Sequence, residues 1–194
     1  MKLNEGPSAG YRDLVIKGQL IEDHFQLIAV NELERLHDLL KGYEISYASG
    51  SWVKKLLFKS NAARAIPQGL YVYGGVGRGK SMLMDLFFES IDNSRKIRVH
   101  FHAFMYEFHE KMRKIRPTRR KNPVRTACQE ILKDISLLCF DEFQVVDITD
   151  AMIIGRVFEE LFSSGITVVT TSNFHPEELY KDGLNRGLFL PFIR

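Results

Sequence analysis

The chain has 194 residues, of which 45% are hydrophobic and 26% charged, and its formal net charge is +3. A chain of this length forms one domain that buries roughly 70% of the surface its unfolded form exposes, which excludes disordered and fibrous classes. The N-terminal residues lack the apolar core of a signal peptide, and no stretch reaches the ~20 apolar residues of a membrane span. We therefore expect a globular cytoplasmic protein in which Cys128 and Cys139 are free thiols without an assigned chemistry.

The N-terminal part of the sequence has the periodicity of a helix. Leucine and valine recur at spacings of three and four within residues 13–40, and Gly42 follows. This pattern predicts one helix over residues 13–40 that ends at Gly42. The turn signal "IPQG" at residues 66–69 comes next. We expect an N-terminal helical segment, residues 1–65, followed by the core of the domain, residues 66–194.

Short apolar and β-branched runs alternate with helical patterns from residue 70 onward. The runs predict strands over residues 70–73, 96–101, 135–140 and 166–171. Helices are predicted after the first three of these strands. Strands that alternate with helices predict an α/β fold, with a parallel sheet covered by helices on both faces.

Eight basic residues and no acidic residue lie between Lys111 and Arg125. A local cluster of this kind is typical of a solvated helix end and loop. It is also typical of a surface that contacts the phosphate backbone of a nucleic acid or an acidic partner. The sequence favours the solvated surface and leaves the contact surface open.

Residues 74–81, "GGVGRGKS", fit the pattern G-x-x-x-x-G-K-[ST] between a predicted strand and a predicted helix. Glycines allow the backbone N–H groups to curl around a phosphate, and the start of the helix adds its positive dipole end. In this loop Lys80 is expected to reach the β and γ phosphates, the Ser81 hydroxyl to bind Mg²⁺, and Arg78 to point to solvent. The predicted phosphate-binding loop consists of Gly74, Gly75, Val76, Gly77, Arg78, Gly79, Lys80 and Ser81.

Two adjacent carboxylates follow the apolar run "LLCF" at residues 137–140. Asp141 can hold Mg²⁺ through its water shell, and Glu142 can polarise an attacking water. The alternative interpretation of this pair is a turn or a helix cap. Because no Asn-Lys-x-Asp sequence for reading guanine follows, we expect the nucleotide to be ATP.

A third polar position, Asn173, ends the last predicted strand. If that strand lies between the two motif strands, Asn173 reaches the γ-phosphate or the nucleophilic water. The alternative is ordinary loop chemistry before His175 and Pro176, which resemble a helix start. The other two motifs favour the catalytic interpretation.

The strings "GLYVYGGVGRGKSMLMDLF", "VHFHAFMYEFHEKM", "LLCFDEFQVVDITDAMIIGRVFEELF" and "VVTTSNFHPEELYKDGLNRGLFLPFI" resemble the AFG-type AAA+ ATPases. The bacterial member of this family takes part in cell division, and the resemblance runs from about Tyr11 to Arg194. It implies a P-loop ATPase that assembles into a ring in its full-length form and uses ATP with Mg²⁺. It further implies a protein partner in the division ring, at the inner face of a bacterial membrane.

The resemblance also implies a role for Arg186, in "GLNRGLFLP", as an arginine finger that reaches a neighbouring subunit's ATP. Many members carry a second arginine two residues later, where this chain has Leu188. The family continues through a fifth core strand and a helical lid. We expect a sheet without that strand and lid, in either a fragment or a shortened gene product that hydrolyses little ATP alone.

Three functions are therefore open at this point. The first is Mg²⁺-dependent ATP hydrolysis that acts on a protein partner. The alternatives are a DNA-associated ATPase of the helicase-loader type, with the basic segment Lys111–Arg125 as its contact, and a nucleotide-binding module without turnover. Phe104 and Met105 also have two interpretations, as a pore loop that grips a polypeptide or as part of the core.

Overall fold

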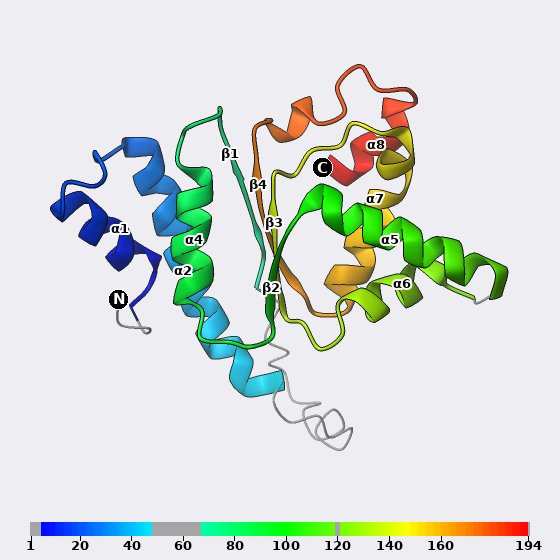
Figure 1. Cartoon of the computed structure of the whole chain (residues 1–194), viewed down its shortest axis with the longest axis horizontal. Helices are drawn as coiled ribbons and strands as arrows, with labels where there is room; N and C mark the ends of the chain where they lie inside the picture. The colour runs from blue at the N-terminus through cyan, green and yellow to red at the C-terminus, as the bar shows by residue number, and fades with distance from the viewer. Residues whose placement is uncertain (1–4, 48–66, 119–120, 194) are drawn as a thin grey trace. The chain divides into compact units, whose positions relative to one another are not determined.

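The computed structural model describes residues 5–47, 67–118 and 121–193 (Figure 1). The chain divides into two compact units, Met1–Gly69 with Met82–Asp92, and Leu70–Ser81 with Asn93–Arg194. We call them the helical unit and the sheet unit and describe each by itself. None of the helices within the described residues has the length and apolar character needed to cross a bilayer.

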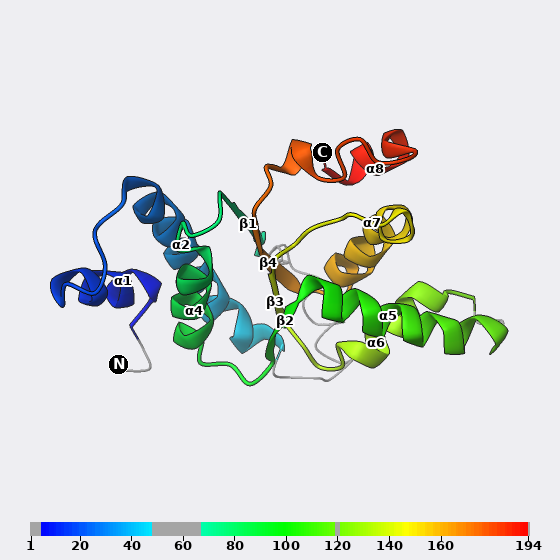
Figure 2. The ribbon, with the colours of Figure 1, turned by 45° about the horizontal axis from the view of Figure 1, so that its top comes forward.

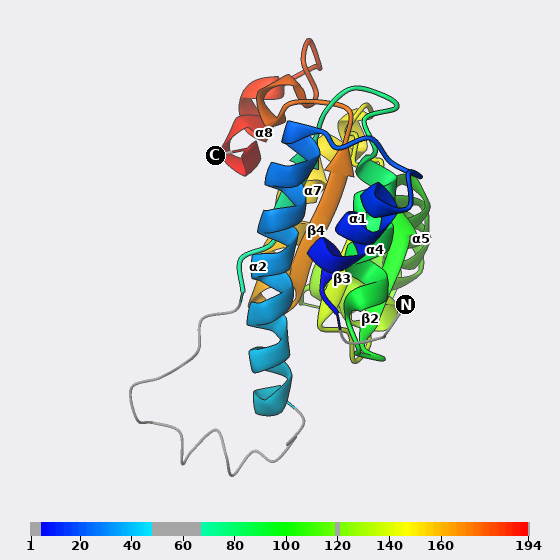
Figure 3. The same cartoon turned by 90° about the vertical axis from the view of Figure 1, so that its left-hand side faces the viewer.

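The helical unit begins with α1 (Pro7–Ile16), which packs against α2 (His24–Tyr47) (Figure 3). The prediction of a single helix that stops at Gly42 is wrong. Residues 17–23 separate α1 from α2, and α2 continues past Gly42. Gly18 has a φ of +69°, a left-handed conformation that ends a helix. The Asp23 carboxylate then accepts hydrogen bonds from the N–H groups of Phe25 and Gln26, in the first turn of α2. This cap starts a new helix.

The predicted apolar stripe of α2 is buried in the helical unit. Val30, Leu33 and Leu36 are each 1% exposed, and Leu40 is 5% exposed. Buried His37 lies on the same helix, and its Nε2 is 3.3 Å from the carbonyl oxygen of Ser90. This contact joins α2 to the last residue of α4 (Lys80–Ser90), the helix that follows the predicted phosphate-binding loop.

The sheet unit contains a parallel sheet of four strands in the order β1-β4-β3-β2 (Figure 1). The strands are β1 (Leu70–Tyr73), β2 (Lys96–His100), β3 (Leu137–Asp141) and β4 (Thr167–Ser172). The predicted α/β class and parallel sheet are confirmed. β4 separates the two motif strands, as the catalytic interpretation of Asn173 requires. Within the described residues, β1 is an edge strand.

The helices of the sheet unit follow its strands and surround an aromatic core. Figure 2 shows α5 and α6 side by side, and α6 also contacts α7. Phe140 and Phe143, at and just beyond the end of β3, pack against Phe101 from α5 and Phe158 from α7. The elements are α5 (Phe101–Ile115), η1 (Arg116–Thr118), α6 (Pro123–Ile131), α7 (Ile148–Ser163), η2 (Pro176–Glu178) and α8 (Arg186–Ile193).

Phe104 and Met105 belong to this core, so their interpretation as a pore loop is wrong. α5 begins immediately after β2, and the two side chains are 3% and 2% exposed. The Phe104 ring meets the Phe140 ring edge to face, with centroids 5.0 Å apart. The exposed aromatic residue in this part of α5 is Tyr106, whose exposed fraction is 74%.

Cys128 and Cys139 are free and buried. Burial raises the pKa of each thiol to about 12. A nucleophilic or metal-binding cysteine is instead a thiolate near neutral pH. The two thiols therefore contribute to packing, as neutral groups.

The carboxyl end of β4 is bonded to the segments that follow both neighbouring strands. The Glu142 N–H donates to the Thr171 hydroxyl at 3.2 Å, and this hydroxyl lies 3.5 Å from Asp141 Oδ1, to which it donates. The Phe143 N–H donates to the Thr171 carbonyl at 2.7 Å. On the other side, the Gly74 N–H donates to the Ser172 carbonyl at 3.2 Å. One strand end thus fixes two loops.

We predict that Thr171→Val destabilises the protein by about 1–3 kcal/mol, because the partly buried Glu142 N–H loses its acceptor. Unfolding in denaturant, followed by circular dichroism, measures this loss.

Thr170→Val is the matched control on the same strand. The Thr170 hydroxyl is buried and makes no hydrogen bond with the described residues, so its removal should leave stability unchanged or raise it. Equal losses for the two variants would contradict the role assigned to the Thr171 hydroxyl.

Candidate nucleotide-binding site

The segment between β1 and α4 is the loop that the sequence predicts to bind phosphate. Gly77 and Gly79 have φ angles of +76° and +81°, a backbone conformation that residues other than glycine adopt only at a cost in energy. The exposed Arg78 lies between them, as predicted. α4 begins at Lys80, so the loop leads directly into a helix N-terminus, where backbone N–H groups favour an anion.

The Lys80 side chain folds back over the loop. Its ammonium donates hydrogen bonds to the carbonyl oxygens of Gly74 and Gly75, each at 2.7 Å. Partial burial lowers the pKa of Lys80 below its ordinary value, and the Glu142 carboxylate raises it in partial compensation. The ammonium is thus held at the loop and interacts electrostatically with the acidic pair after β3.

The two carboxylates after β3 have different environments. Asp141 is 13% exposed and forms an ion pair with Arg98 of β2, at 2.6 Å from Nε to Oδ2. Glu142 is 72% exposed, and its Oε2 lies 3.9 Å from Nδ1 of His100. Glu142 also has a positive φ of +54°. Asp141 is a fixed group, whereas Glu142 extends toward solvent.

Arg98 and Thr171 are site residues that the sequence analysis missed. The available signal was the charged Arg98 within a strand of a parallel sheet, where most residues are apolar. It lies two positions before His100, on the same face of β2.

Asn173 directly follows β4, and its side chain is exposed. The next residue is fixed by two bonds: the Phe174 N–H donates to the Ser172 hydroxyl at 3.1 Å, and the Phe174 carbonyl accepts from the Tyr71 hydroxyl at 2.9 Å. Asn173 therefore projects from a well-bonded turn at the same sheet edge as the other two motifs.

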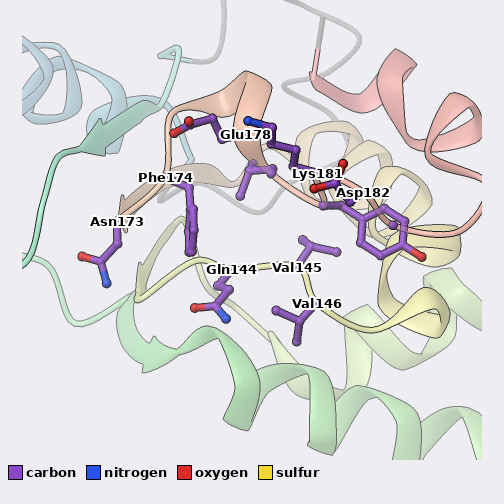
Figure 4. Close-up of a pocket in the computed structure, with 11 residues that line it drawn as sticks. Gln144, Val145, Val146, Asn173, Phe174, Glu178, Lys181 and Asp182 are labelled. Carbon is purple, nitrogen blue, oxygen red and sulfur yellow. The ribbon is translucent and has the colours of Figure 1, made fainter.

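A cavity of about 580 Å³ lies beside Asn173 (Figure 4). Its walls come from the loop after β3, the turn after β4 and the segment after η2. The residues that line it are Gln144, Val145, Val146, Asn173, Phe174, Glu178, Leu179, Tyr180, Lys181, Asp182 and Gly183. These lining residues include none of the phosphate-binding loop, so the cavity is a neighbour of the candidate nucleotide site and not the site itself.

Arg186 lies apart from these three motifs, at the first position of α8. One of its Nη atoms donates to the carbonyl oxygen of Glu177. Its buried Nε makes no hydrogen bond within the part of the chain that the structure describes. In this chain the guanidinium is therefore directed at η2, and Leu188, two positions later, is 71% exposed.

The groups at this sheet edge suit a nucleotide phosphate chain with Mg²⁺. Magnesium prefers oxygen ligands and keeps several of its waters. The Ser81 hydroxyl is exposed, and the Asp141 carboxylate is held in a defined orientation. Lys80 adds a positive charge at the loop that phosphate oxygens can approach.

Comparisons with known proteins agree with this arrangement. Residues 6–194 match the family described as AFG1-like ATPase. The cell division protein ZapE of Escherichia coli strain K12 is 41% identical over 192 residues, which cover 96% of this chain and 51% of ZapE. Lactation elevated protein 1 homolog B of Danio rerio is 52% identical over 136 residues, which cover 66% of this chain and 27% of that protein.

Among solved structures, the crystal structure of DnaI matches with a TM-score of 0.55 and 15% sequence identity, covering 90% of this chain and 80% of that chain. At this identity the similarity shows the fold alone. The chain spans about half the length of ZapE and about a quarter of the Danio rerio relative. The family match covers nearly the whole chain, and the chain therefore belongs to the AFG1-like ATPase family.

Proposed function

We propose that this chain binds ATP with Mg²⁺ and is the catalytic part of an ATP-hydrolysing AAA+ protein. The observation that carries the proposal is that hydrogen bonds to the end of β4 hold both the loop of Lys80, through the Gly74 N–H, and the turn of Glu142, through its own N–H. A cation for the phosphates and a carboxylate for water are thereby brought to one sheet edge. Family membership supports the same conclusion.

The residues have distinct roles in this proposal. The loop from Gly74 to Gly79 presents backbone N–H groups to the phosphates, and Lys80 neutralises the charge on the β and γ groups. Ser81 and Asp141 hold the metal, which would stabilise negative charge on the phosphate oxygens.

Three further residues act on the nucleophile or across subunits. Glu142 accepts the proton of the attacking water, and Asn173 orients that water or the γ-phosphate. Arg186 completes the site of a neighbouring subunit in a ring. For that it must leave the carbonyl of Glu177, which it contacts within its own chain.

The proposal extends to a protein partner in cell division, in the cytoplasm at the division site. Its support is the similarity to the cell division protein ZapE.

A DNA-associated ATPase is less well supported. In the described part of the basic segment, Lys111 lies 3.8 Å from Glu130, and Arg113 bonds Glu110 at 2.8 Å, so part of the positive charge is neutralised. Arg119 and Arg120 lie outside the described residues.

We predict that Lys80→Ala weakens ATP binding roughly tenfold or more, because a charged hydrogen-bond donor to the phosphates is lost. Titration calorimetry on the full-length protein measures the affinity. Lys133→Ala is the control, since Lys133 is exposed and lies before β3, at the opposite end of the strand from Asp141. Equal affinities for the Lys80 variant and the parent would overturn the assignment of the loop.

For Glu142→Gln we expect retained ATP binding and turnover that is lower by roughly tenfold or more, because an amide cannot accept the proton of water. A phosphate-release assay, run beside nucleotide titration, separates the two quantities. Glu159→Gln, an exposed change of the same type on α7, should behave as the parent. Turnover at the parent rate in the Glu142 variant would remove this carboxylate from the reaction.

A further inference from the structure

Arg98 contacts the carboxylate that the proposed function assigns to Mg²⁺. In the sheet register Arg98 pairs with Cys139, and His100 pairs with Asp141. The Arg98 side chain therefore reaches two residues forward along the neighbouring strand. Its Nε donates to Asp141 Oδ2 at 2.6 Å and its Nη2 donates to Oδ1 at 3.2 Å. The side chains of Arg98 and Asp141 are 21% and 13% exposed.

This two-point contact determines what remains of Asp141 for another ligand. A carboxylate offers about four acceptor sites on its two oxygens. Arg98 occupies one site on each oxygen, and the Thr171 hydroxyl, at 3.5 Å, takes a second site on Oδ1. One acceptor site therefore remains, on Oδ2. The direction in which this site points is set by Arg98, because the guanidinium fixes the orientation of the carboxylate.

The same contact changes the charge of the site. The Asp141 carboxylate and the Arg98 guanidinium together are neutral, so Asp141 attracts a divalent cation less strongly than an unpaired carboxylate would. In a partly buried position the effect persists, because solvent and salt screen it only in part. A planar guanidinium is also suited to fixing a carboxylate at two points, which a lysine ammonium is not.

We propose that Arg98 is a positioning residue of the nucleotide site, which orients Asp141 toward the metal and lowers its affinity for Mg²⁺. The inference rests on the proposed function, in which Asp141 holds the metal. As a consequence, the metal–nucleotide complex is correctly aligned, and its Mg²⁺ can still dissociate. A residue that merely fastened β2 to β3 would have a different effect, because its loss would weaken folding, metal binding and turnover together.

Two variants separate the charge of Arg98 from its geometry. Arg98→Gln removes the positive charge and keeps a polar amide, whereas Arg98→Lys keeps the charge and loses the planar fork. Arg95→Gln is the matched control. Arg95 lies just before β2, and its Nε donates to the Asp134 carbonyl at 2.7 Å.

The experiment is a titration of Mg²⁺ into the full-length protein with a non-hydrolysable ATP analogue, followed by the fluorescence of a labelled nucleotide. We expect the half-saturating Mg²⁺ concentration of Arg98→Gln to fall by roughly threefold to tenfold, since a nearby positive charge is gone. Arg98→Lys should stay within about twofold of the parent. Turnover by phosphate release should fall in both, because the orientation of Asp141 is lost, while Arg95→Gln matches the parent.

A half-saturating concentration that stays the same or rises in Arg98→Gln overturns the inference and leaves the proposed function intact. A parent protein without Mg²⁺-dependent nucleotide binding overturns the proposed function, and the inference with it. Circular dichroism and thermal unfolding establish that each variant is folded. If Arg98→Gln does not fold, a change of more than about threefold in Arg98→Lys contradicts the role assigned to the charge.

Discussion

The hydrogen bonds at the carboxyl end of β4 are the constraint on which the candidate site depends. Backbone and side-chain groups of Thr171 and Ser172 bind the loop after β1 on one side and the turn after β3 on the other. Neighbouring strands lie about 4.8 Å apart, so the two motif strands are separated by roughly twice that spacing. The charges of Lys80 and Glu142 interact across this separation.

The acidic pair illustrates how one turn suits the two roles proposed for it. Asp141 is enclosed and bonded on two sides, so its position is set before any ligand arrives. Glu142 is mostly exposed and is near His100 only at 3.9 Å, so its side chain can adjust to a water molecule. A metal ligand benefits from preorganisation, whereas a proton acceptor must reach its substrate. Burial thus differs between these adjacent residues in the sense that their proposed roles require.

Local patterns predicted much of this arrangement. The eight-residue loop has a spacing that few other structures require, and the alternation of strands and helices predicted the parallel sheet. The single-helix prediction failed because Gly18 and the cap at Asp23 act over a few residues that a hydrophobic period averages out. Burial of Phe104 could not be decided from spacing, since core and pore-facing aromatics share the same period.

Contacts between distant residues account for the rest. Arg98 and Asp141 are 43 residues apart, and only the strand register shows that they meet. The contact of Arg186 with the Glu177 carbonyl depends on how the segment between η2 and α8 turns, which residue types alone do not determine. These interactions are set by tertiary structure, so a motif can name the ligand while leaving the neighbours of each side chain unknown.

The backbone at Glu142 has a consequence for how the protein balances durability against turnover. Its φ of +54° is a conformation that glycine adopts freely and that costs other residues roughly 1–2 kcal/mol. At this position the fold would be relaxed by glycine, yet glycine has no carboxylate. The strain is therefore retained at the residue proposed to activate water. At this position, selection for higher stability and selection for faster turnover therefore oppose each other.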